Sequence, residues 1–292
     1  MDYLIHILTT AAIFAIVALA LDLLVGFGGM ISLASGVFFG IGAYSSALLV
    51  KAGWPAYAAL LFGMGLSTIL SLLIALPAIR IRGVYLLIVT ISVQVIFTTI
   101  AQNWRSVTGG DAGVSNIPAL SILDWKLRGV PFLFMVLASC AALWMLMRRI
   151  VDSPFGRVLR AIRDDELGAA SLGKHATAVK LAAFALSACV AAYAGSLYAH
   201  YTSYIDPHTF NIGLSIMILL MVMLGGAGTL SGPMVGAVVL TILPEALKFL
   251  PLPPGVAPAL RQFTYGALLV AVVFVRPQGL FGKAAPPRRT HG

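Results

Sequence analysis

Runs of about 20 apolar residues recur along nearly the whole of this chain, and they constrain its fold more than any other feature. A helix needs roughly 20 mostly apolar residues to cross about 30 Å of hydrocarbon. With 60% hydrophobic and only 10% charged residues, the 292-residue chain has more apolar surface than a soluble core of this length can bury. The sequence therefore predicts an all-α integral membrane protein, a polytopic bundle of roughly eight to ten transmembrane helices.

Apolar windows give a working count of nine spans. They cover residues 4–25, 30–50, 56–79, 84–101, 130–147, 180–199, 210–224, 233–249 and 257–275. The first window lacks the basic region and the small-residue cleavage site of a signal peptide, so we expect a retained span. The second window and the 210–249 region are rich in glycine, and we expect broken or re-entrant helices there. Such backbone is tolerated only where it is buried in protein or lines a cavity.

Lysine and arginine set the expected orientation, because cytoplasmic loops are enriched in them. They gather between the third and fourth windows, in segment 148–179 and in the C-terminal tail, and not in a soluble module that could bind nucleic acid. Nine alternating spans then place the N-terminus outside and the C-terminus inside. We expect one transmembrane domain over residues 1–282, with an external loop at about 102–129, a cytoplasmic loop at about 148–179 and a cytoplasmic tail over 283–292.

The middle of the cytoplasmic loop predicts one or two short amphipathic helices outside the membrane. Its sequence, GRVLRAIRDDELGAASLGK over 156–174, combines helix formers, leucines at helical spacing, and arginines three residues apart beside an acidic run. Charges of both signs can fix the register of a docked partner, and leucines can anchor it. A plain solvated loop is the alternative that the residues leave open. The candidate docking residues are Arg157, Arg160, Arg163, Asp164, Asp165, Glu166, Leu167 and Gly173.

Two glycine-rich segments, one in each half of the chain, resemble each other. Paired glycine-interrupted segments in the two halves of a transporter point to its translocation site. The alternative is that small residues spaced by four let membrane helices pack closely. The candidate path residues are Gly28, Gly29, Ser32, Gly36 and Gly40 in the first segment and Gly225, Gly226, Thr229, Gly232 and Gly236 in the second.

Segment 168–175 falls one residue short of a phosphate-binding Walker A loop. His175 stands where the Mg²⁺-binding hydroxyl belongs, and no strand precedes Gly168. The five histidines are dispersed without metal-ligand spacing, and no G-x-S-x-G elbow is present. We therefore expect no enzyme, no catalytic residue, no metal and no cofactor.

The few ionisable residues inside the windows lie near window ends. Asp22 and Glu245 are expected to cap or hydrate helix ends rather than to relay protons. An ion-coupled carrier or channel acting alone is therefore the less favoured alternative. His200 and His208 are expected to face solvent at the external side.

Six segments carry a family resemblance that runs over nearly the whole chain. They are LVGFGGMISLASGVFFGIGAYSSALL (24–49), IRIRGVYLLIVTISVQVIF (79–97), TGGDAGVSNIP (108–118), SPFGRVLRAIRDDELGAASLG (153–173), LGGAGTLSGPMVGA (224–237) and VRPQGLFG (275–282). Together they resemble the inner-membrane permease subunits of branched-chain amino acid ABC importers, of the high-affinity leucine, isoleucine and valine type. Within the fourth segment, Glu166, Ala169, Ala170 and Gly173 resemble the E-A-A-x-x-x-G pattern of such permeases, with departures in spacing.

The resemblance implies a multi-pass protein of the bacterial inner membrane that forms the path for branched-chain amino acids. It implies a second, related permease in a heterodimer, two cytoplasmic ATP-binding subunits and an external solute-binding protein. Segment 153–173 would hold the coupling helix that sits in a groove of the ATPase. The external loop around Thr108-Gly109-Gly110-Asp111 is our hypothesis for part of the surface that receives the binding protein. The same architecture carrying urea, short amides or aromatic acids is the alternative.

Overall fold

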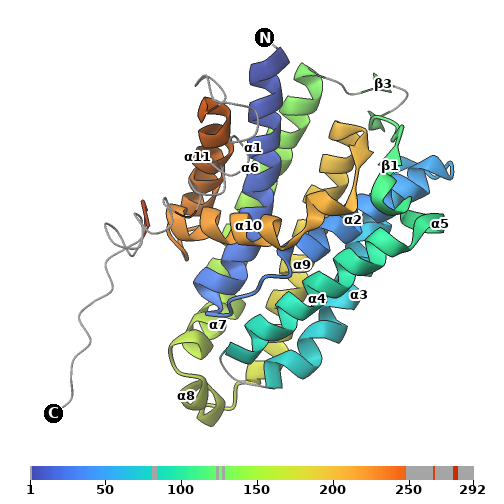
Figure 1. Cartoon of the computed structure of the whole chain (residues 1–292). Coiled ribbons are helices and arrows are strands. Elements are labelled where there is room, and N and C mark those ends of the chain that lie inside the picture. The colour runs from blue at the N-terminus through green and yellow to red at the C-terminus, as the bar shows by residue number, and fades with distance from the viewer. Residues whose placement is uncertain are drawn as a thin grey trace.

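The computed structural model describes residues 2–80, 84–122, 125–126, 129–247, 266 and 279–281, which form a helical bundle (Figure 1). Five helices in this part of the chain are long and apolar enough to cross a membrane: α1 (Asp2–Asp22) with the π-helical turn η1 (Leu23–Phe27), α3 (Ala56–Arg80), α4 (Val84–Asn103), α6 (Val130–Asp152) and α9 (Ala176–Thr202). Three apolar helices are shorter: α2 (Ser35–Lys51), α10 (Ile212–Gly225) and α11 (Ser231–Leu247).

The remaining elements are small and connect the apolar helices. They are α5 (Arg105–Thr108), η2 (Gly110–Ala112), β1 (Val114–Ser115), β2 (Ser121–Ile122), β3 (Trp125–Lys126), α7 (Pro154–Asp164), α8 (Glu166–Ser171), β4 (Tyr204–Ile205) and η3 (Pro207–Phe210). Strand β1 pairs antiparallel with β4, and β2 with β3.

The helices confirm the all-α membrane architecture that the sequence predicts. The first eight apolar windows each fall on one of the apolar helices. The ninth window, 257–275, lies outside the described residues except for Gly266. The working count of nine spans is therefore not confirmed.

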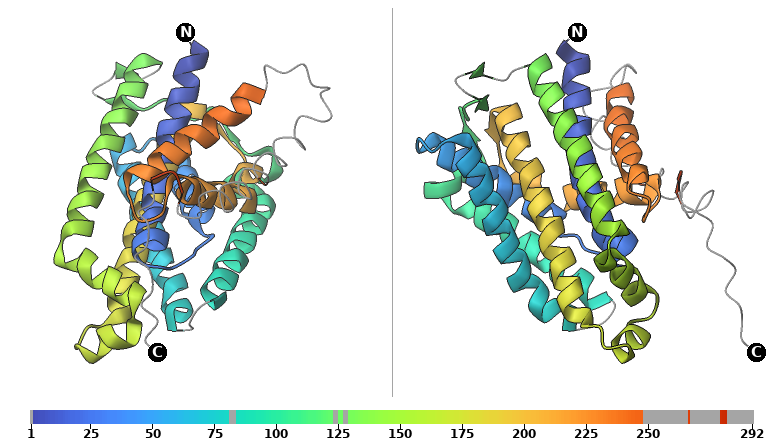
Figure 2. Two further views of the ribbon diagram at one scale, coloured as in Figure 1. Left: turned by 90° about the vertical axis from the view of Figure 1, so that its left-hand side faces the viewer. Right: turned by 180° about the vertical axis from the view of Figure 1, so that it is seen from behind.

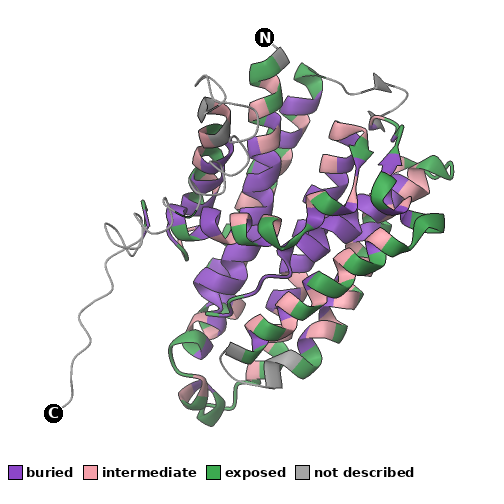
Figure 3. Cartoon of the chain, viewed as in Figure 1, coloured by how far each residue is buried: buried purple, intermediate pink, exposed green. Residues whose placement is uncertain are grey.

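Helix α1 forms the centre of the bundle. Every residue from Ile13 to Asp22 is buried, whichever side of the helix it lies on, because α1 packs against α6, α9, α10 and α11. A helix that is apolar on every side is stable only when other helices surround it. Figure 3 shows burial gathered along α1, whereas α3 and α4 carry many exposed residues. The exposed residues of α3 include the large apolar side chains of Tyr57 and Leu61, which suit lipid or a partner subunit.

The glycines of the second apolar window do not break its helix, because α2 is continuous from Ser35 to Lys51, and the interruption lies before it, over residues 28–34. The chain leaves the helical path after η1, and α2 begins only at Ser35, among buried residues. Side chains from other helices satisfy the freed backbone, because the Leu33 amide donates to Thr90 Oγ1 at 3.1 Å and the Gly36 amide to Ser215 Oγ at 2.9 Å. An unpaired amide in such an apolar surrounding would destabilise the fold by several kcal/mol, about the cost of an unsatisfied backbone group in the hydrocarbon core of a bilayer.

Gln94 completes this buried polar network. Its side-chain oxygen accepts a hydrogen bond from Ser215 Oγ at 2.9 Å, and its side-chain nitrogen donates to the Phe210 carbonyl at 2.6 Å. Thr90, Gln94 and Ser215 are all fully buried. The network therefore joins α4, the start of α2 and the start of α10.

The 210–249 region is also interrupted. Helix α10 has 14 residues, which span about 21 Å at 1.5 Å per residue and fall short of a bilayer core of about 30 Å. Figure 1 shows α10 lying across the bundle instead of along α1, with α11 running beside α1 after the turn. The Asn211 side chain caps α10 by accepting from the Leu214 amide at 3.2 Å.

Two long connections lie at opposite ends of the bundle. Helices α7 and α8 stand at one end, and the N-terminus, α5 and the strands stand at the other (Figures 1 and 2). The predicted cytoplasmic loop and the predicted external loop are thus separated as the nine-span layout requires. Which end faces the cytoplasm stays a prediction from the distribution of basic residues.

The expectation that His200 is solvated is wrong. Its side chain is 3% exposed and contacts Ser46 Oγ and the Pro118 carbonyl, each at 2.8 Å. These contacts tie α9 to α2 and to the connection after β1. His208 matches the expectation, because its exposed ring lies 3.6 Å from the exposed carboxylate of Asp111.

Replacing Gln94 tests the role of the buried network. Gln94→Leu leaves the Ser215 hydroxyl without its acceptor, so we expect a loss of about 1–3 kcal/mol in the free energy of unfolding. The matched control is Ser92→Leu on the exposed face of the same helix, which should unfold close to the unaltered protein. Unfolding of the detergent-solubilised chain measures both. Equal stabilities for the two variants would contradict this role.

Candidate coupling site

The predicted docking segment forms two short helices at one end of the bundle. Ser153 is the N-cap of α7 and Pro154 takes its first position, where its missing amide costs nothing. Leu159 and Ile162 are buried on one face of α7, which packs against α6, α9 and η1. The amphipathic pattern thus seats α7 on the bundle.

Arg163 connects α7 to the end of helix α1. Its Nη1 donates to the Gly26 carbonyl in η1 at 2.7 Å, and its Nη2 lies 2.9 Å from the exposed carboxylate of Asp164. Gly29 leaves room for the stem of Arg163, because a Cβ on Gly29 would lie 2.5 Å from Arg163 Cγ. Its φ of +65° also favours glycine. Arg163 is therefore bonded to the protein's own fold, although its side chain stays 37% exposed.

Asp22 connects the same end of α1 to the turn between α10 and α11. The buried carboxylate accepts hydrogen bonds from the Gly228 amide at 2.7 Å and the Leu230 amide at 3.1 Å. The contact is close, because a Cβ on Gly26 would lie 2.1 Å from the Gly228 nitrogen. The sequence-based expectation that Asp22 caps a helix end is replaced by a more specific role, since the amides it caps belong to a distant segment.

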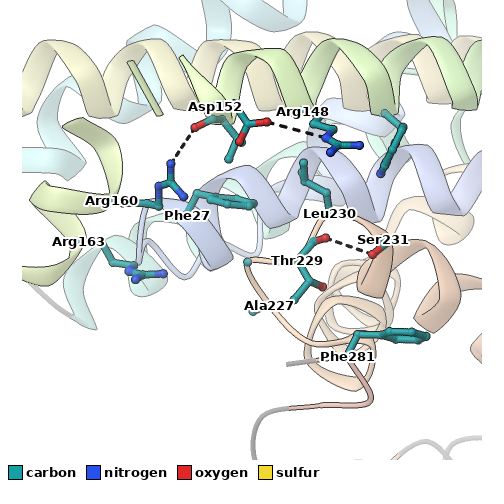
Figure 4. Close-up of a pocket in the computed structure, with 13 residues that line it drawn as sticks. Phe27, Arg148, Asp152, Arg160, Arg163, Ala227, Thr229, Leu230, Ser231 and Phe281 are labelled. Atoms are coloured by element: carbon teal, nitrogen blue, oxygen red, sulfur yellow. Dashed lines mark hydrogen bonds and ion pairs between the residues drawn. The ribbon is translucent and has the colours of Figure 1, made fainter. Parts of the chain in front are cut away.

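A cavity of about 850 Å³ opens where these elements meet (Figure 4). It is lined by Phe27 of η1, by residues of α6 and α7, by residues 227–231 and by Phe281. The Phe281 amide donates to the Gly225 carbonyl at 3.0 Å, so residues 279–281 close over the C-terminal end of α10. Figure 4 shows Arg148, Arg160 and Arg163 around this space with Asp152.

Most charges of the docking segment hold its own helices together. Arg157 Nη1 donates to the Asp152 carbonyl at 3.1 Å, and Arg160 Nη2 to the Val151 carbonyl at 3.1 Å. Asp165 caps α8 by accepting from the Gly168 amide at 3.0 Å. These bonds fix the angle between α6, α7 and α8.

Two leucines of the segment project away from the bundle. Leu167 is 65% exposed and Leu172 is 79% exposed, although both are large and apolar. Glu166 beside them forms an ion pair of 2.7 Å with Lys180 of α9, which anchors α8 to the bundle. Gly173 follows with a φ of +74° and no atom within 4 Å of an added Cβ. The tip formed by α8 and the turn after it is thus an exposed apolar surface outside the apolar helices.

Segment 168–175 has no phosphate-binding geometry. Gly168 to Ser171 lie within helix α8, so their amides are not arranged in a loop after a strand. The resemblance to a Walker A loop is therefore one of sequence alone.

The glycines of the second candidate segment lie at close helix contacts. An added Cβ on Gly225 would lie 2.0 Å from the Gly232 carbonyl oxygen, and one on Gly236 would lie 2.0 Å from the Met221 carbonyl oxygen. Gly226 adopts a φ of +107° at the turn, and Thr229 Oγ1 donates to its carbonyl at 2.7 Å. These contacts fit the packing interpretation of small residues.

The first candidate segment divides between two sites. Gly28 and Gly29 lie at the end of η1, whereas Ser32, Gly36 and Gly40 lie along the break and the start of α2. Gly36 faces the Ser215 and Gln94 network, and Gly40 faces Phe97. A role of these ten residues in a translocation path stays a prediction.

Sequence reasoning did not single out Thr90, Gln94 or Ser215. Each is a lone polar residue in an apolar helix, and the available signal was that the broken helices need partners for their free amides. Which polar side chain supplies that partner depends on the tertiary structure.

Residues 3–273 match the family described as the permease component of branched-chain amino acid transport systems. The high-affinity branched-chain amino acid transport system permease protein LivM of Salmonella typhimurium is 30% identical over 97% of this chain and 71% of its own length. LivM of Escherichia coli is 29% identical over the same shares, and LivH of Escherichia coli is 28% identical over 94% of this chain and 93% of its own length.

The contacts of Asp22 generate a stability prediction. Asp22→Ala should destabilise the fold by about 1–3 kcal/mol for each buried amide left unpaired, and Asp22→Asn should cost less because one acceptor oxygen remains. Asp152→Ala is the matched control, because its carboxylate is 67% exposed and lies 3.8 Å from Arg148. Thermal unfolding in detergent would refute the assignment if Asp22→Ala and Asp152→Ala melted alike.

Proposed function

The chain belongs to the permease family of branched-chain amino acid transport systems, and on that premise we propose that it forms the path for leucine, isoleucine and valine in an ATP-driven importer. Residues 3–273 match the family, which covers almost every described element. It is a multi-pass protein of the inner membrane, with the apolar helices described above. The names of its relatives support the choice of cargo.

We propose that the chain works beside a second, related permease. LivM and LivH of Escherichia coli are both named as permease proteins of a high-affinity branched-chain amino acid transport system, and both resemble this chain. A heterodimer of two such permeases is therefore favoured. Two cytoplasmic ATP-binding subunits and an external solute-binding protein complete the proposed importer.

The tip of α8 is the proposed contact with an ATP-binding subunit. Exposed leucines outside the membrane are apolar anchors of the kind that interfaces bury, and the charges around them set the register. The ATP site then lies in the partner subunit, since Gly168 and its neighbours are helical here. The chain is a transport subunit in this assembly.

The contacts of Arg163 and Asp22 carry motion from that tip into the membrane helices. When the ATPase moves α7, Arg163 moves the Gly26 carbonyl at the end of α1. Asp22, one helical turn earlier, moves the amides of Gly228 and Leu230 between α10 and α11. Three segments far apart in sequence thus respond as one body, which is what coupling requires.

Uptake measurements test the proposed cargo. Deleting the chain should abolish uptake of labelled leucine at low concentration, and restoring it should return uptake that unlabelled isoleucine and valine inhibit. Urea, acetamide and benzoate should not compete. Unchanged leucine uptake after deletion, with loss of urea or benzoate uptake instead, would replace the amino acid cargo by one of these alternatives.

The exposed leucines test the docking surface. Leu167→Ser combined with Leu172→Ser should reduce co-purification of the ATP-binding subunit at least about tenfold, because apolar anchors dominate such contacts. Leu4→Ser is the matched control, since Leu4 is 64% exposed and belongs to the N-terminal start of α1, which stands at the opposite end of the bundle from α8. Undiminished co-purification of the double variant, with all proteins inserted equally, would exclude this surface.

A further inference from the structure

Positive charge gathers around the cavity of about 850 Å³ at the end of the bundle that carries α7 and α8 (Figure 4). Three arginines line it, Arg148 from α6 and Arg160 and Arg163 from α7. Among the described lining residues only Asp152 is acidic. The cavity therefore has an excess of positive charge, which the proposed docking of α8 does not use.

Arg148 is the least committed of the three arginines. Its side chain is 61% exposed, and its Nε lies 3.8 Å from the Asp152 carboxylate, which is beyond hydrogen-bond distance. The guanidinium lies over the Trp144 ring, with its Cζ 5.4 Å from the ring centroid. It makes no hydrogen bond to a described residue, so its N–H groups can still bind a phosphate through two parallel bonds.

Arg160 also keeps a donor for a ligand. Its Nε donates to the Gly156 carbonyl at 3.3 Å and its Nη2 to the Val151 carbonyl at 3.1 Å, whereas its Nη1 has no partner among the described residues. Arg163 differs, because its guanidinium is already paired with Asp164. The donors that remain thus come from two helices, α6 and α7, on the same cavity.

The C-terminal part of the chain cannot neutralise these arginines with an acidic side chain. After Glu245 the sequence contains no aspartate or glutamate. The tail over 283–292 adds further lysine and arginine instead. Buried or half-buried charges are normally paired, so the cavity calls for an anion from outside the chain.

The face of α6 that carries Arg148 continues along the helix as an exposed apolar strip. Phe134, Leu137 and Met145 lie on that face at helical spacing from Arg148, and all three are exposed. In a membrane protein such a strip can contact acyl chains. A molecule that has both an anionic phosphate and acyl chains fits the strip and the arginines together, whereas a soluble anion leaves the strip unused.

The position of the cavity also suits a lipid headgroup. Phe27, at the end of the central helix, and Trp144 line it beside the arginines. Tryptophan and arginine at the ends of spanning helices are typical of the membrane–water interface. The cavity lies on the predicted cytoplasmic side, where basic pockets between helices bind anionic headgroups.

We propose that this cavity binds the phosphate of an anionic phospholipid. Arg148 and Arg160 donate hydrogen bonds to the phosphate oxygens, and the acyl chains lie along the exposed face of α6. The bound lipid joins α6 to α7 at their junction. The inference does not depend on the proposed cargo, because it uses only the membrane location of the chain and the groups around the cavity.

Lipid titrations of the full chain in neutral detergent test the site. The dissociation constant of long-chain phosphatidylglycerol should rise about fivefold in Arg148→Gln, the size expected for one basic residue at an anionic lipid. Arg149→Gln is the matched control, because Arg149 is the next residue of α6, carries the same charge and does not line the cavity. Its dissociation constant should stay within about twofold of the unaltered value.

Two further ligands distinguish the sources of the phosphate. Phosphatidylcholine with the same acyl chains should bind at least about fivefold more weakly, because its choline group opposes the arginines. Inorganic phosphate should not displace phosphatidylglycerol at equal concentration, since it has no chains for the apolar strip. These results, with the selective effect of Arg148→Gln, would support the lipid site.

Other results would overturn it. Equal weakening in Arg148→Gln and Arg149→Gln would show only a general attraction to surface charge. Displacement by equal inorganic phosphate would assign the cavity to a soluble anion. Unchanged lipid binding in Arg148→Gln, with reduced co-purification of the ATP-binding subunit, would assign it to a subunit contact. A failure of the proposed cargo would leave these lipid measurements unaffected, so the two proposals fail separately.

Discussion

The buried carboxylate of Asp22 is the interaction on which the end of the protein that carries α7 depends. In an apolar surrounding every free backbone amide needs a partner, and the turn between α10 and α11 exposes two of them to Asp22. The carboxylate satisfies both from the end of the central helix. Since Arg163 of α7 holds the next turn of the same helix through Gly26, the two contacts make one junction from three distant segments.

The same constraint explains the second polar centre of the molecule. The break before α2 frees amides that Thr90 and Ser215 satisfy, and Gln94 ties them to the start of α10. Both centres therefore lie where a glycine-rich segment interrupts a helix. Helix α10 takes part in both, because its start meets Gln94 and its end meets the turn held by Asp22. Helix α10 thus connects the two polar centres.

The sequence predicts the apolar helices well, because a run of apolar residues in a membrane protein has few other uses. It also places α7 and α8, since their amphipathic spacing is local. The direction of Arg163 was not predictable: arginines three residues apart share a face of the helix, and only the position of η1 decides which one turns inward. The expectation that His200 faces solvent was wrong for a similar reason, because its partners Ser46 and Pro118 come from segments far away in the chain. Lone polar residues such as Gln94 show no pattern until the helix that they satisfy is known.

The proposed coupling requires that α7, α8 and the turn after α10 move as one body. Spin labels at Lys174, after α8, and at Ser231, after the turn, measure their separation in the importer assembled with its ATP-binding subunits. We predict that ATP leaves this distance unchanged while the distance from Lys174 to a label at Trp54, at the far end, shifts. In Arg163→Ala the Lys174–Ser231 distance should change with ATP. A change of that distance in the protein with Arg163 intact would contradict the account.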